Sequence, residues 1–197
     1  DKEIASDLNI EKVLYNNIKT ENTKKEVVEE EPLSNHKIIG NRDMNQNLDI
    51  TLYKDSILDD KLKRCLDYCG YIRPSPVQKQ VIPYSNGDLI VCAMTGSGKT
   101  AAFLIPIINS ILVHGVVDYS VNSLILAPTR ELVHQICHEA QRLTYRTGIN
   151  VKMVYGGSDV NEQIQNIQTG CHILIATPGR LIDFIDRQVL SIQKIDY

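Results

Sequence analysis

From residue 88 onward, short runs of aliphatic residues alternate with stretches of helical periodicity. The runs span residues 88–92, 123–127, 151–155 and 172–176, are rich in Ile, Val and Leu, and are each followed by Gly or Pro. A strand that is apolar throughout is typical of a parallel sheet, in which both faces are buried. Four successive strand-then-helix units therefore predict an α/β fold with a parallel sheet and helices on both faces.

A helix is predicted ahead of the first strand, from residue 55 to residue 69. Gly70 follows it as a stop signal. The residues at helical spacing that we expect to face a core are Ile57, Leu58, Leu62, Cys65, Leu66 and Cys69.

The first 50 residues differ in kind from the rest. Residues 1–50 carry 11 acidic and 7 basic side chains, whereas residues 51–197 carry 13 and 14. The first section is rich in Asn, Glu and Lys and has few residues that could build a core. We therefore expect residues 1–50 to be a largely disordered acidic extension and residues 51–197 to be one domain. A short ordered piece at residues 8–18 is the alternative for part of the extension.

Composition narrows the class of protein. A net charge of −3 argues against a broad basic surface for nucleic acid, although a local groove would not show in that total. No apolar run approaches the roughly 18 residues of a membrane span, and no secretion signal is visible, so no membrane partner is expected. The five cysteines are scattered without a Cys-x-x-Cys pair, which favours a reducing compartment, the cytoplasm or the nucleus.

A phosphate-binding loop is predicted where the first strand meets the following helix. Its residues are Ala93, Met94, Thr95, Gly96, Ser97, Gly98, Lys99 and Thr100. Glycines let backbone N–H groups turn toward phosphate oxygens, the lysine reaches the terminal phosphates, and the Thr hydroxyl binds Mg²⁺. The strict pattern has Gly at the first position, where this chain has Ala93. The loop indicates nucleotide binding without identifying the base.

The segment from Gly70 to Gln78 permits two interpretations. Ser75, Pro76 and Gln78 form a capping box with Pro at the first helical position, which would give Gln78 a purely structural role. An amide side chain can also pair with the edge of adenine, because it donates and accepts at once. The segment alone leaves both interpretations open.

Three further motifs follow the later strands. They are Pro128-Thr129-Arg130-Glu131, then Tyr155-Gly156-Gly157-Ser158, then Thr177-Pro178-Gly179-Arg180. Thr129 and Thr177 are natural helix caps, and an arginine can hold a phosphate through two parallel hydrogen bonds. Each motif alone is typical of an ordinary strand-to-helix turn. Their joint occurrence, in order, around a phosphate loop favours a common function.

A metal site is the competing interpretation of His134, Cys137 and His138. The two histidines lie four residues apart on a predicted helix, but a zinc peptidase needs Glu directly after the first one, and Gln135 stands there. We therefore interpret these three as ordinary helix residues.

Taken together, these motifs resemble those of the DEAD-box family of ATP-dependent RNA helicases, over roughly residues 51–197. The segment ending at Gln78 is similar to the family's adenine-reading Q motif, with Tyr53 at the customary place of an upstream Phe and Ser75 in place of Thr. The Ala93 start of the phosphate loop is the form that this family uses. The three later motifs resemble motif Ia, the double-glycine motif and motif Ib. Residues 8–18 are faintly similar to the Vasa-like subgroup.

The resemblance implies a RecA-like P-loop domain that uses ATP and Mg²⁺ and acts on RNA. Catalysis would involve Lys99 and Thr100, with Thr100 at the Mg²⁺; the residues implied for the nucleotide are Tyr53, Tyr71, Arg73, Ser75, Gln78 and the loop from Ala93 to Thr100. Sequence-independent contacts to single-stranded or short duplex RNA would come from Pro128, Thr129, Arg130, Glu131, Gly156, Gly157, Thr177, Pro178, Gly179 and Arg180. The resemblance does not specify which protein partners residues 1–50 would bind.

The chain contains no Asp-Glu-Ala-Asp sequence, which in this family supplies the carboxylates for hydrolysis on the next strand. We expect the chain to be truncated before that Walker B strand, and to be inactive in hydrolysis and strand separation by itself. Two other functions remain open. One is another P-loop ATPase, such as a DNA helicase; the other is a non-catalytic RNA-binding module.

Overall fold

The structure is a computed structural model that describes residues 37–40, 51–85, 87–115 and 120–197. The chain divides into two compact units. Unit 1 comprises Asp1–Ile57 and Lys63–Lys99, and unit 2 comprises Leu58–Leu62 and Thr100–Tyr197. Helix α4 (Lys99–His114) begins at the last residue of unit 1. The single predicted domain is therefore described as two units.

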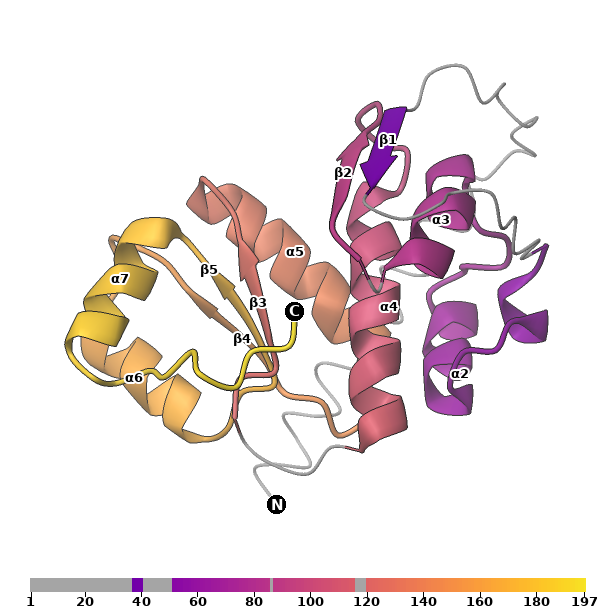
Figure 1. The fold of residues 1–197 in the computed structure, drawn as a ribbon. Coiled ribbons are helices and arrows are strands. Elements are labelled where there is room, and N and C mark those ends of the chain that lie inside the picture. The colour runs from indigo at the N-terminus through magenta and orange to yellow at the C-terminus, as the bar shows by residue number, and fades with distance from the viewer. Residues whose placement is uncertain (1–36, 41–50, 86, 116–119) are drawn as a thin grey trace. The chain divides into compact units, whose positions relative to one another are not determined.

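Unit 2 contains a three-stranded parallel sheet (Figure 1). Its strands are β3 (Ser123–Leu126), β4 (Val151–Val154) and β5 (Ile173–Ala176), in the order β3-β5-β4. The register aligns Leu126, Ala176 and Val154 at the carboxyl ends. Three of the four predicted strands are thus confirmed as one parallel sheet, and the segments that follow them leave the sheet at the same edge.

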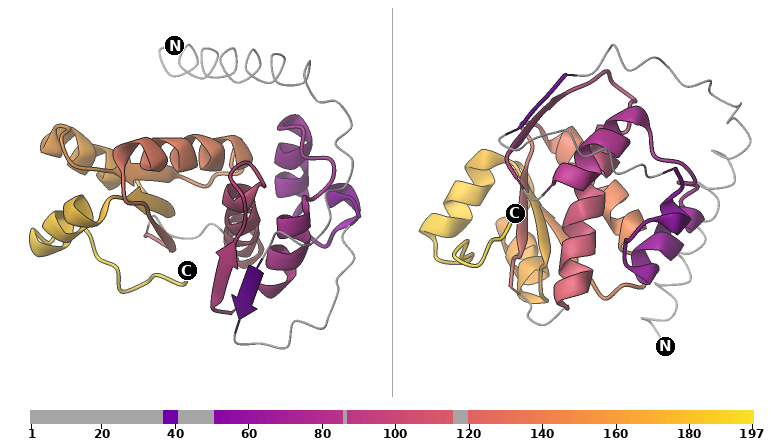
Figure 2. Two further views of the ribbon diagram at one scale, coloured as in Figure 1. Left: turned by 90° about the horizontal axis from the view of Figure 1, so that it is seen from above. Right: turned by 45° about the vertical axis from the view of Figure 1, so that its right-hand side comes forward.

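Helices cover both faces of this sheet. All four residues of β5 are buried although successive side chains point to opposite faces. The covering helices include α5 (Arg130–Leu143), α6 (Val160–Gln168) and α7 (Pro178–Asp186). Helices α6 and α7 supply Ile167 and Phe184 to a buried cluster with Leu174 of β5. In the views of Figures 1 and 2, α5 and α7 lie on opposite sides of the strands. The predicted α/β class is confirmed.

The outer edge of β3 is paired by the last two residues of the chain. Asp196 N donates to Asn122 O at 2.9 Å, and Leu124 N donates to Tyr197 O at 2.9 Å. This pattern is that of a parallel neighbour. The backbone of Asp196 and Tyr197 thus adds to the sheet on the side of β3 away from β5.

Unit 1 contains a separate antiparallel pair, β1 (Lys37–Gly40) and β2 (Leu89–Cys92), in which Lys37 lies opposite Cys92. One expectation is corrected here. Strand β2 was expected in the parallel sheet, but it pairs with β1; its apolar composition indicated a strand without identifying its neighbour. Strand β1 lies within residues 1–50, which were expected to be largely disordered, and two isoleucines in four residues were too weak a pattern to predict it. Residues 8–18 lie outside the described part of the chain.

The predicted helix over residues 55–69 is shorter in the structure. A 3₁₀ turn, η2, covers Tyr53–Asp55, and α2 covers Asp60–Tyr68. The side chain of Asp59 accepts a hydrogen bond from Lys61 N at 2.8 Å, which starts the helix there because a side-chain oxygen satisfies an otherwise free N–H. Ile57, expected in the core, is 93% exposed, whereas Leu62 and Leu66 are fully buried as predicted.

Two short elements complete unit 1: α3 (Pro76–Val81) and the 3₁₀ turn η3 (Ile82–Tyr84). Helix α3 starts where the capping box predicted, with Ser75 as its N-cap and Pro76 in its first turn. Across the described residues of both units, no helix has the length and apolar character that crossing a membrane requires.

Candidate functional site

The phosphate loop of unit 1 joins the end of β2 to the start of α4, as predicted. Gly96 and Gly98 have φ of +83° and +88°, a region that favours glycine. A Cβ added to Gly98 would also lie 2.5 Å from Gln78 Nε2, whereas one added to Gly96 would meet open space. Gly98 is therefore required twice, for its backbone conformation and for the close approach of Gln78.

Lys99 is folded back onto its own loop. Its ammonium group donates to Ala93 O at 2.6 Å and to Met94 O. The hydroxyl of Ser97 is buried and has no partner among the described residues. The loop thus holds a cation and an unsatisfied hydroxyl next to the start of α4, where Thr100 is half-buried. Both groups fit the oxygens of a phosphate, provided that Lys99 exchanges the carbonyl groups for them.

Gln78 links the adenine-reading segment to the phosphate loop. Its Oε1 accepts hydrogen bonds from the Tyr53 hydroxyl at 2.8 Å and from Ser75 N at 2.7 Å. Its Nε2 donates to Gly98 O at 3.1 Å. Ser75 adds a second link, because its hydroxyl donates to Ser97 O at 2.8 Å. The capping-box role predicted for Gln78 is therefore confirmed, and the residue is only 2% exposed.

Tyr53 supports Gln78 from the interior of unit 1. Its side chain is 2% exposed, and burial raises the pKa of its hydroxyl well above the usual range, so the group stays a donor. Its ring meets that of Tyr71 edge to face, with centroids 6.4 Å apart. Arg73 is exposed. The structure thus brings together Tyr53, Tyr71, Ser75, Gln78 and the loop, with the Tyr53 ring covered.

In unit 2 the predicted motifs Ia, double-glycine and Ib follow β3, β4 and β5 at one edge of the sheet. A cavity of about 480 Å³ opens there, lined by Arg130, Glu131, His134, Tyr155, Gly157 and Ser158. Thr129 caps α5 as predicted, because its Oγ1 accepts from Leu132 N at 3.3 Å. A backbone hydrogen bond, the Thr129 side chain and, to a lesser extent, nearby Arg130 and His134 lower the pKa of Glu131. The cavity is therefore lined by a cationic side chain, Arg130, and an anionic one, Glu131.

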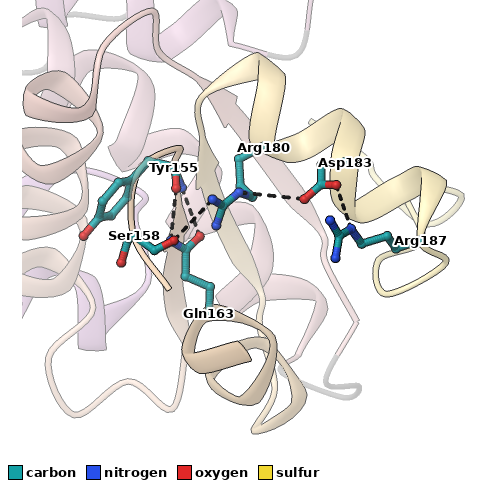
Figure 3. Close-up of polar contacts among 6 residues, drawn as sticks. All are labelled: Tyr155, Ser158, Gln163, Arg180, Asp183 and Arg187. Atoms are coloured by element: carbon teal, nitrogen blue, oxygen red, sulfur yellow. Dashed lines mark hydrogen bonds and ion pairs between the residues drawn. The ribbon is translucent and has the colours of Figure 1, made fainter. Parts of the chain in front are cut away.

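The double-glycine loop is in contact with Arg130. Gly157 has φ +81°, and a Cβ added to it would lie 2.7 Å from Arg130 Nη1, whereas one added to Gly156 would meet nothing within 4 Å. Gln163 holds the start of the loop: its Oε1 accepts from Tyr155 N at 3.1 Å and its Nε2 donates to Tyr155 O at 3.0 Å (Figure 3). The backbone of this loop is thus fixed by α6.

Arg180, predicted to contact RNA, lies mostly inside the protein. Its side chain is 10% exposed; Nη2 donates to Ser158 O at 3.3 Å, and Nε lies 3.9 Å from an oxygen of Asp183 (Figure 3). Nη1 is buried without a partner among the described residues. At the start of α7, Thr177 is the N-cap and Pro178 follows, but the Thr177 side chain makes no capping bond, so that part of the prediction is wrong. Pro178 at the first helical position removes one of the N–H groups that have no partner inside the helix.

Comparison with models of protein families identifies the family of this chain. The family model described as DEAD/DEAH box helicase matches residues 75–197. The chain belongs to the DEAD/DEAH box helicase family. The predicted resemblance is thereby confirmed, while the Vasa-like subgroup stays a prediction.

Two solved helicase structures are similar to the chain. The RNA helicase Prp28 from Chaetomium thermophilum, bound to ADP, is 35% identical with a TM-score of 0.68; the match covers 80% of this chain and 39% of that one. A DEAD box protein from the hyperthermophile Methanococcus jannaschii is 30% identical with a TM-score of 0.63, over 74% of this chain and 40% of that one. The chain thus spans about two fifths of these relatives, and the RecA-like helicase fold is confirmed.

Two features of the candidate site in unit 2 were missed in the sequence analysis. Gln163 occupies a helical position on the apolar face shared with Val160 and Ile167, and a polar residue on such a face is a signal for a buried hydrogen-bonding role. His134, considered for a metal site, has its ring 4.7 Å from that of Tyr155. The neighbouring Cys137 is buried, which raises the pKa of its thiol to about 11.

Proposed function

We propose that this chain is the nucleotide-binding part of an ATP-dependent RNA helicase, and that it binds ATP with Mg²⁺ and the backbone of single-stranded RNA. Hydrolysis and strand separation belong to the complete protein. The observation that carries the proposal is the position of Gln78, which is hydrogen-bonded at once to Tyr53, to Ser75 and to Gly98 of the phosphate loop. Base and phosphate recognition are therefore coupled through one side chain.

On the nucleotide side, Lys99 would move from the carbonyl groups of Ala93 and Met94 to the terminal phosphates. The ammonium group has hydrogen-bond acceptors in either position, so the exchange does not leave a bare charge. The Ser97 hydroxyl would gain the partner it lacks. Thr100 would hold Mg²⁺, which neutralises the charge of the phosphate oxygens when it is bound.

Adenine would pair with Gln78. The amide oxygen already accepts two hydrogen bonds, while Nε2 uses one of its two N–H groups. Bidentate pairing with adenine therefore requires the oxygen to release one donor, and the Tyr53 hydroxyl is the side-chain donor. Binding of the base and the bond between Tyr53 and Gln78 would then be in competition.

On the RNA side, the cavity of unit 2 would hold the phosphate backbone. Arg130 offers a guanidinium group at the start of α5, where the helix N-terminus also favours an anion. Pro128, Gly156 and Gly179 are exposed at the same edge of the sheet. Contacts of this kind do not read the bases, so we propose binding that is independent of sequence. With five free cysteines, we propose the cytoplasm or the nucleus as the compartment.

Competition between nucleotides tests the proposal. The full chain would be titrated with a fluorescent ATP analogue and displaced with ATP or GTP, for wild type, Gln78→Ala and the exposed-site control Lys54→Ala. We expect ATP to displace at least tenfold better than GTP, and Gln78→Ala alone to remove the preference. Equal displacement by ATP and GTP in the wild type would favour another P-loop ATPase.

A second titration distinguishes the proposed helicase function from that of a non-catalytic RNA-binding module. Binding of a labelled single-stranded RNA would be measured with and without a non-hydrolysable ATP analogue and Mg²⁺. The complete protein should bind RNA more tightly with the analogue, because its nucleotide and RNA sites are coupled. Affinity that is independent of the analogue in the complete protein would support the module instead.

A further inference from the structure

We infer that Gly157 is a positioning residue: its missing side chain leaves the space in which the guanidinium group of Arg130 lies. The inference rests on the proposed RNA site and deepens it. The resemblance implied that both glycines contact RNA themselves. The structure instead places an arginine side chain against the second glycine.

The distances show how tight this contact is. A Cβ on Gly157 would lie 2.7 Å from Arg130 Nη1, closer than real Cβ atoms come to a neighbouring atom, and 3.2 Å from its Cζ, which is also tight. Gly156 has open space at the same position. The two glycines therefore differ: substitution of Gly157 moves Arg130, whereas substitution of Gly156 moves nothing.

The loop itself is held in place, so the arginine must give way. Gln163 fixes both backbone groups of Tyr155, and Arg180 donates to Ser158 O on the other side of the glycines (Figure 3). The start of α5 is fixed as well, through the Thr129 cap. The end of the Arg130 side chain is the flexible part. An alanine at position 157 would thus redirect the guanidinium group with little other rearrangement.

Salt-dependent RNA binding tests this role. Anisotropy of a labelled oligouridylate would be followed from 50 to 300 mM salt for Gly157→Ala, Arg130→Ala and the double variant. Loss of one phosphate contact lowers the magnitude of the log–log slope by about 0.7 for a single strand. A charged hydrogen bond corresponds to a loss of roughly tenfold or more in affinity. We expect all three variants to show the same slope and the same affinity.

Gly148 serves as the matched control, and Gly156 provides a comparison within the same loop. Gly148 has φ +88° and open space around a Cβ, so Gly148→Ala reproduces the backbone strain without touching Arg130. Gly156→Ala tests direct approach of RNA to the first glycine. Gly148→Ala should keep the wild-type slope and affinity, and Gly156→Ala should lose less than Gly157→Ala. A loss in Gly156→Ala equal to that in Gly157→Ala, or an additive loss in the double variant, would overturn the inference.

The side-chain NMR signal of the Arg130 Nε–H group gives a readout that needs no RNA, with Arg130→Lys to assign it. It should shift in Gly157→Ala and stay in place in Gly148→Ala and Gly156→Ala. A signal that is unmoved by Gly157→Ala would refute the positioning role. If the wild-type chain failed to bind RNA while this shift occurred, the proposed function would fail and the role of Gly157 in placing Arg130 would stand.

Discussion

Replacing Tyr53 with Phe should weaken the fold and strengthen ATP binding at the same time. The substitution removes one hydroxyl, which donates to Gln78 Oε1 at 2.8 Å in the interior of unit 1. The ring and its edge-to-face contact with Tyr71 are retained. Gln78 Oε1 keeps its bond from Ser75 N, so no acceptor is left without a partner.

The expected loss of stability follows from this geometry. A neutral hydrogen bond contributes about 1 kcal/mol net, and the buried acceptor remains satisfied. For a chain of this size, about 1 kcal/mol lowers the melting temperature by roughly 2 to 4 °C. Tyr68→Phe is the matched control. The Tyr68 side chain is largely exposed, so loss of its hydroxyl group should leave the melting temperature unchanged.

The expected gain in affinity comes from the same bond. Under the proposed function, adenine competes with the Tyr53 hydroxyl for Gln78 Oε1. Without the hydroxyl, adenine no longer has to displace a hydrogen bond worth about 1 kcal/mol. This corresponds to a roughly fivefold lower Kd for ATP. Guanine presents an acceptor where adenine presents a donor, so the Kd for GTP should not improve.

Calorimetric titration with ATP and GTP, together with thermal unfolding, measures both effects. Weaker ATP binding by Tyr53→Phe would refute the reasoning, because it would show that the hydroxyl supports the nucleotide-bound state. An equal gain for ATP and GTP would also refute it, since the freed oxygen should favour adenine alone.

Three further predictions concern particular contacts. Gly98→Ala should unfold at a lower temperature than Gly96→Ala, because both add backbone strain of about 1 to 2 kcal/mol but only the former displaces Gln78; equal melting temperatures would contradict this. Gln163→Ala should lower the free energy of unfolding by about 2 kcal/mol in urea titrations, because both backbone groups of Tyr155 lose their partner, and a loss below 0.5 kcal/mol would count against the contact. The pKa of Glu131 is lowered from 4.5 in the folded chain, so its carboxylate stabilises the fold above that pH and loses this effect as pH falls through the folded value. Glu131→Gln should therefore melt below the wild type at pH 7 and level with it once the pH lies below the folded-state pKa of Glu131; a difference that persists in strong acid would be inconsistent with this.

Local patterns were sufficient to predict most elements of unit 2. The strands β3, β4 and β5 were expected to within one residue at either end, because short aliphatic runs followed by Gly or Pro favour buried strands. The cap at Thr129 and the start of α3 at Pro76 also follow from neighbouring residues. Such features depend on interactions within one turn of the chain.

Long-range contacts were beyond the reach of these patterns. The pairing of β2 with β1 depends on a segment about 50 residues away, and the contact of Arg130 with Gly157 on one 27 residues away. The bond from Tyr53 to Gln78 joins residues 25 apart. The residue types at these positions indicated chemistry, but not which partner each group would find, because the fold brings the partners together.

The most direct test of the central claim is a titration of the full chain with ATP and Mg²⁺. Wild type and the control Lys54→Ala should bind with the same Kd, and Lys99→Ala should weaken binding at least tenfold, since its ammonium group is the charge available to the phosphates in this loop. Wild-type affinity in Lys99→Ala, with the fold intact by circular dichroism, would contradict the assignment of this loop as the ATP site.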